Sequence, residues 1–152
     1  GHGQVVFLTG EAGIGKSRLA RELRAASKAG DFLPTTLHGS QHHQNVAYYP
    51  IAEHLERIAA SRRGDAPEGE ARERLVALLQ NRGVRNAQAL RTLEELLAPA
   101  AVHDAAAPPE DPQARRRRVR DALVSVLLET AEKRPVLLLV EDAHWLDPVS
   151  YT

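Results

Sequence analysis

Near its amino end the chain reads Gly10-Glu11-Ala12-Gly13-Ile14-Gly15-Lys16-Ser17. Four residues separate Gly10 from Gly15, and Lys and Ser follow directly, which is the Walker A spacing. Glycines allow positive φ and carry no Cβ, so successive backbone N–H groups can converge on phosphate oxygens. Lys16 can reach the β- and γ-phosphates, and the Ser17 hydroxyl is a hard oxygen suited to Mg²⁺. The pattern predicts a phosphate-binding loop rather than an ordinary glycine turn.

The residues on either side of this loop have the expected periodicity. Residues 5–9, Val-Val-Phe-Leu-Thr, are apolar on both faces and predict a buried strand of a parallel sheet. From Lys16 the apolar positions follow a helical stripe that includes Leu19 and Leu23, with Gly30 as the stop. A strand, a glycine loop and a helix, in this order, form the context in which such a loop binds phosphate.

The pattern of the remaining chain predicts one further strand, then a group of helices, and then a final strand. We expect strands over residues 35–39 and 136–140, helices over residues 50–61, 68–80, 87–97 and 113–133, and a connection rich in Ala and Pro over residues 98–112. The predicted fold is therefore α/β: a P-loop NTPase three-layer sandwich with a partial parallel sheet. We expect a single, incomplete domain over residues 1–152, in which residues 50–133 form a mostly helical insertion.

Two acids follow the last predicted strand, in a Walker B arrangement. Glu141 and Asp142 come directly after Val136-Leu137-Leu138-Leu139-Val140. One acid could hold a Mg²⁺-bound water while the other orients and deprotonates the attacking water. The alternative is an acidic strand end that is simply solvated. With Walker A upstream we favour the functional interpretation, and the division of roles between the two acids stays open.

Composition excludes several classes of protein and site. Lys plus Arg total 20 and Asp plus Glu total 20, so no net charge draws the protein to nucleic acid or to an anionic membrane. There are no cysteines, which excludes disulfides, thiolate metal sites and a cysteine nucleophile. No apolar run is long enough to span a bilayer. We expect a soluble, cytoplasmic protein with no membrane partner.

Three segments carry a resemblance to a known family. They are residues 10–19, residues 43–45 with 48–51, and Glu-Asp-Ala-His-Trp-Leu-Asp-Pro at 141–148. Together they resemble the regulatory ATPase modules of the AAA+/STAND group. In bacteria such modules are fused to class III adenylate or guanylate cyclases and to large LuxR-type transcription regulators. The resemblance implies an ATP-driven switch that controls a neighbouring output domain.

The resemblance also implies roles for individual residues. Glu141 matches the acid that holds the Mg²⁺-bound water and Asp142 matches the catalytic position, although the order Glu-Asp departs from the commoner Asp-Glu. The implied catalytic residues are Lys16, Glu141 and Asp142, and the implied metal ligands are Ser17, Glu141 and Asp142. The implied ATP- or ADP-binding residues are Gly10, Glu11, Ala12, Gly13, Ile14, Gly15, Lys16, Ser17 and Arg18.

Two other functions stay open. One is a small-molecule P-loop kinase, and the other is a non-catalytic interaction module whose helices bind a partner while nucleotide stabilises the fold. In the group that the chain resembles, the strand after Walker B inserts between the Walker A and Walker B strands. That strand would begin after Thr152, so we expect this chain to bind nucleotide and to hydrolyse it very slowly. Without that strand, either residues 5–9 and 136–140 draw together, or both strands expose edges that favour a homo-oligomer.

Three further groups of residues have simpler interpretations. His42 and His43 are adjacent, which is a poor spacing for metal ligands, so we expect a polar loop. We expect His144 and Trp145 to pack rather than to contact nucleotide. The run Arg115-Arg116-Arg117-Arg118, with Arg120, has no interleaved aromatic residues. It predicts a solvated helix start or a contact with a partner, and no direct binding of nucleic acid.

Overall fold

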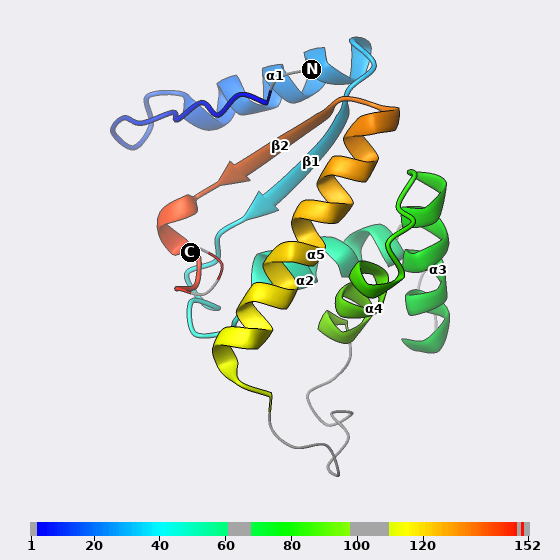
Figure 1. Ribbon diagram of the computed structural model, residues 1–152. Helices are drawn as coiled ribbons and strands as arrows, with labels where there is room; N and C mark the ends of the chain where they lie inside the picture. The colour runs from blue at the N-terminus through cyan, green and yellow to red at the C-terminus, as the bar shows by residue number, and fades with distance from the viewer. Residues whose placement is uncertain (1–2, 61–67, 98–109, 149, 151–152) are drawn as a thin grey trace.

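The computed structural model describes residues 3–60, 68–97, 110–148 and 150 (Figure 1). Its elements in chain order are α1 (Lys16–Ala29), β1 (Leu33–His38), α2 (Tyr49–Ala60), α3 (Glu68–Asn81), α4 (Ala87–Leu96), α5 (Pro112–Lys133), β2 (Val136–Glu141) and the 3-10 helix η2 (Ala143–Trp145). Each of these helices and strands other than η2 begins and ends within about two residues of its prediction, the usual uncertainty of such boundaries. Most of the predicted connection, residues 98–109, lies outside the described residues.

The two strands form a parallel pair between layers of helix. Leu33 pairs with Val136, and the register continues to His38 opposite Glu141. Helix α1 contacts both strands, whereas α2 contacts β1 and α5 contacts β2. Figure 1 shows α1 on one side of the strands and the other four helices on the opposite side. The α/β class is confirmed, with a parallel sheet that is two strands wide in the described part of the chain.

The main apolar core lies among the helices of residues 49–133. Leu75, Val84 and Leu93 are at most 1% exposed, and they belong to one buried cluster that also includes Leu55 of α2. Leucines recur on one face of α3 and of α4, so each helix can bury a stripe against the next. These helices therefore have a core of their own beside the sheet. No helix in the described part of the chain is long and apolar enough to cross a membrane.

One member of the arginine run has a structural role. The guanidinium of Arg118 donates to carboxylate oxygens of Glu95 on α4 at 2.5 Å and of Glu110 at 2.7 Å. The bond to Arg118 lowers the pKa of Glu110 below its ordinary value. Arg118 thereby connects α5 to α4 and to Glu110, two residues before the start of α5.

The prediction of a buried strand over residues 5–9 is wrong in this structure. The segment has no strand pairing, and the side chains of Val5 and Phe7 are 81% and 84% exposed. In Figure 1 it runs as an extended coil beside α1. A strand forms only when a neighbour accepts its backbone hydrogen bonds, and in the described residues β1 and β2 pair with each other alone. The apolar composition of residues 5–9 predicts burial, but it does not specify a neighbouring strand to pair with.

Candidate functional site

The glycine loop folds around the ammonium group of Lys16. The Lys16 Nζ donates to the carbonyl oxygens of Gly10 at 2.7 Å and Glu11 at 2.8 Å. Residues 10–15 and Ser17 are exposed and Lys16 is partly buried, so an incoming anion has access to the loop. The lysine charge therefore lies within the loop, at the position where the sequence places phosphate.

Glycine conformation explains how the loop leads into α1. Gly13 and Gly15 have φ of 82° and 102°, which are left-handed values that other residues rarely adopt. A Cβ at either position would meet no atom within 4 Å, so the requirement for glycine comes from the backbone angle and not from crowding. Gly15 is the N-cap of α1 and provides no side-chain cap, and Ser17 lies in the first turn. Helix α1 thus begins with backbone N–H groups that can donate hydrogen bonds to an anion, and with its positive dipole end toward the loop.

The two acids lie at the end of β2. Glu141 is the last residue of the strand and is partly buried, whereas Asp142 is exposed. Asp142 has φ 54° and ψ 42°, a left-handed conformation that Asp tolerates better than most residues. Its carbonyl accepts from the Trp145 N–H at 2.8 Å, which starts the turn of η2. The backbone therefore changes direction between the two acids, and their side chains are not interchangeable.

The loop and the acids lie on the same side of the molecule. The carboxyl ends of β1 and β2 coincide, because His38 pairs with Glu141. Figure 1 shows the start of α1 at the same end of the sheet as η2, which follows Asp142. In open α/β sheets, ligands bind outside the carboxyl ends of the strands. The two groups that sequence analysis assigned to phosphate and to Mg²⁺ therefore lie at the same end of the sheet.

Comparison with known proteins places the chain in a family. The profile of the AAA ATPase domain matches residues 1–152. The chain belongs to the AAA ATPase domain family. An uncharacterized protein of Rhizobium meliloti (strain 1021) is 31% identical over 157 residues, which cover 99% of this chain and 14% of that protein. The chain thus spans about one seventh of its relative's length. No solved structure matches it significantly.

The family match indicates the general activity of the chain, which is that of a nucleotide-binding ATPase module. AAA ATPase domains are P-loop modules that bind nucleotide, typically with Mg²⁺. In this AAA ATPase domain the exposed loop, the start of α1 and the acids of β2 have the chemistry that such a ligand needs. The start of α1 offers N–H groups to a phosphate, and the Ser17 hydroxyl and the two carboxylates are hard oxygens suited to Mg²⁺.

Gly39 is a residue of this site that sequence analysis did not identify. It follows β1, and its N–H donates to the Glu141 carbonyl at 2.9 Å. A Cβ on Gly39 would lie 2.2 Å from the carbonyl oxygen of Asp142, which is closer than any real contact. Only a glycine lets the end of β1 approach the backbone of the two acids so closely. A glycine directly after a strand was the only signal in the sequence.

We expect Gly39→Ala to lower the free energy of unfolding by about 1–3 kcal/mol, since the added methyl must push the β2 end away. Gly30→Ala is the matched control, because its Cβ would have ordinary contacts of 3.6 Å or more and its φ is −90°. That control should stay within about 0.5 kcal/mol of the parent or be slightly more stable. Urea unfolding of both variants is the measurement. Equal stability of the two variants would contradict the close approach of Gly39 to Asp142.

Asp147, the last acid of the resembling segment, has a structural contact. It is 2% exposed, and its carboxylate accepts from the N–H of Ser150 at 2.9 Å and from the hydroxyl of Ser150 at 2.5 Å. These bonds close the turn that follows η2. The spacing Asp-x-x-Ser could have indicated such a turn, because Asp side chains commonly accept from backbone N–H groups nearby.

The histidines and Trp145 mostly make local ring contacts. The ring of His43 stacks on Tyr49 at 3.8 Å, and its Nδ1 lies 2.9 Å from the Ser40 hydroxyl. His144 is exposed, and its ring lies 4.8 Å from that of the partly buried Trp145. No group of three metal-binding side chains comes together in the described ranges. The polar-loop interpretation of His43 fits these contacts.

Proposed function

We propose that this AAA ATPase domain binds ATP or ADP with Mg²⁺ through residues 10–18, and that it hydrolyses ATP within its full-length protein. Lys16 contacts the β- and γ-phosphates, and the Ser17 hydroxyl coordinates Mg²⁺. Glu141 would hold Mg²⁺ through a water, and Asp142 would orient and deprotonate the water that attacks the γ-phosphate.

The observation that carries this proposal is the position of the loop relative to the acids. The loop that holds Lys16 opens at the start of α1, and β2 ends in Glu141 at the same end of the sheet. The exposed, left-handed Asp142 comes one residue later, outside the register of the strands. This arrangement supports Glu141 as the fixed acid and Asp142 as the one that reaches a water.

We also propose that nucleotide acts as a switch for a neighbouring output domain. The relative from Rhizobium meliloti is about seven times as long as the segment that it shares with this chain, which supports a module within a larger protein. The resemblance to modules fused to cyclases and to LuxR-type regulators indicates the kind of output. The exposed side chains of Val5, Val6 and Phe7 would serve a further contact, with another part of the protein or with a second copy. We place this module in the cytoplasm, where ATP is available.

The test is to identify the nucleotide that accompanies the protein through purification. Acid denaturation should release ATP or ADP, recognised by mass, in an amount approaching one per chain. Protein purified in the same way with Lys16→Ala should release much less. Equal amounts from both proteins would contradict the assignment of the loop, and release of another nucleotide would contradict the proposed ligand.

A further inference from the structure

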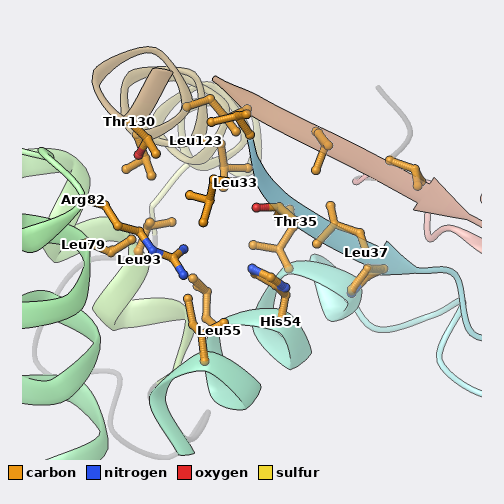
Figure 2. Close-up of a pocket in the computed structure, with 18 of the residues that line it drawn as sticks. Leu33, Thr35, Leu37, His54, Leu55, Leu79, Arg82, Leu93, Leu123 and Thr130 are labelled. Atoms are coloured by element: carbon orange, nitrogen blue, oxygen red, sulfur yellow. The ribbon is translucent and has the colours of Figure 1, made fainter. Parts of the chain in front are cut away.

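A second site lies on the other face of the sheet, away from the glycine loop. A cavity of about 310 Å³ separates the strands from α2, α3, α4 and α5 (Figure 2). Alternate residues of both strands line it, among them Leu33, Leu37 and Leu138. Leu138 and Val140 are 41% and 43% exposed on this face, so the helices do not close over the strands. Its volume is at the lower end of the range of small-molecule sites.

One charged side chain enters this apolar space. Arg82 follows the end of α3, and Figure 2 shows its guanidinium projecting among Leu79, Leu55 and Leu93. Burial lowers the pKa of Arg82 from its ordinary value. Within the described part of the chain, its guanidinium makes no ion pair or hydrogen bond, and the cavity lining contains no Asp or Glu. A partly desolvated cation without a counter-charge is unfavourable, and an anion in the cavity would remove that cost.

The other polar side chains that line the cavity are uncharged, so none of them would repel an anion bound beside Arg82. His54 of α2 lies across from Arg82, and its Nδ1 accepts from the Arg57 Nη2 at 3.0 Å. Burial, and then the charges of Arg57 and Arg82, lower the pKa of His54 to about 4, so it is uncharged at pH 7. The hydroxyl of Thr35 points into the same space (Figure 2). Arg82 is therefore the only full charge that the described lining presents to a ligand.

We propose that this cavity binds an apolar carboxylate, whose head group pairs with Arg82 and whose hydrocarbon part lies between the strands and the helices. A planar guanidinium matches a carboxylate in a two-point hydrogen bond. A phosphate dianion would leave a net negative charge in an apolar space, since one arginine supplies one positive charge. The proposal concerns a different face from the nucleotide site and does not depend on nucleotide.

Calorimetric titration of the protein with decanoate, without nucleotide, tests this proposal. We expect one saturable site, with affinity rising about four-fold for each methylene added from hexanoate to decanoate, the value for burial of a CH₂ group. Uncharged decanamide should bind at least about ten-fold more weakly, because it cannot form the ion pair.

Two variants and one control locate the site. Arg82→Gln should weaken decanoate about ten-fold or more and leave decanamide unchanged. Leu138→Trp, which fills the open face of the cavity beside Thr35, should abolish binding of both ligands. Arg91→Gln is the control, because Arg91 is exposed on α4 and outside the cavity lining. Absence of saturable decanoate binding would overturn the proposal. So would undiminished decanoate affinity in Arg82→Gln or in Leu138→Trp, which would place the ligand elsewhere.

Discussion

Glu141→Gln and Asp142→Asn should each bind ATP nearly as well as the parent protein and hydrolyse it about 10²-fold or more slowly. An amide keeps the size of the acid but cannot accept a proton or provide a charged metal ligand. General-base groups contribute about 10²–10⁴ in rate, so the larger loss is expected for Asp142→Asn. The measurement is single-turnover release of phosphate by the full-length protein, together with ATP affinity for each variant.

Asp121→Asn is the matched control for these two variants. Asp121 is 68% exposed and pairs with the adjacent Arg120 on α5, so removal of its charge should not change hydrolysis. If both variants at the end of β2 hydrolyse ATP at the parent rate, the acids have no catalytic part. Nucleotide would then stabilise a non-catalytic interaction module, which was one of the alternatives that the sequence left open.

Lys16→Ala should remove the stabilisation of the domain by ATP and Mg²⁺. Ligand at about 100 times its dissociation constant adds about 2.7 kcal/mol to the free energy of unfolding, which raises the Tm by about 5–10 °C for a domain of this size. Without Lys16 the β- and γ-phosphates lose their main cationic partner. Both hydrogen bonds of Lys16 in the loop are exposed, so the Tm without nucleotide should change little.

Lys28→Ala is the control for Lys16→Ala. Lys28 is an exposed lysine in the last turn of the same helix, at the end away from the loop. Its replacement removes the same charge without touching the loop, and the nucleotide-dependent rise in Tm should persist. A rise of the same size in Lys16→Ala would contradict the assigned role of Lys16.

Local sequence patterns were sufficient to predict most of the helices and strands, and the Walker A and Walker B motifs. The leucine spacing of α3 and α4 sets which face is buried, and Gly15 followed by Lys16 marks the start of α1. A run of five apolar residues also predicted the strand β2. These features depend on neighbours in the sequence or on simple periodicity.

Features that depend on distant backbone could not be predicted in this way. Residues 5–9 have the composition of a buried strand, yet strand formation requires a hydrogen-bonding neighbour that composition does not specify. Gly39 is needed because of its approach to Asp142, about a hundred residues later in the chain. From the sequence alone, Arg82 would be interpreted as an ordinary charged residue after a helix. Only the packing of α3 against α2 and α4 places its guanidinium at the cavity.

The most direct test of the account is a calorimetric titration of the purified, nucleotide-free protein with ATP and Mg²⁺, and separately with AMP. The loop binds through the β- and γ-phosphates, which AMP lacks, and charge-assisted hydrogen bonds to them contribute about 1.5–3 kcal/mol each. We predict one saturable site for ATP and an affinity for AMP that is at least about 100-fold weaker. No saturable heat with ATP, or equal affinities for ATP and AMP, would contradict the claim that residues 10–17 bind the phosphates of a nucleotide.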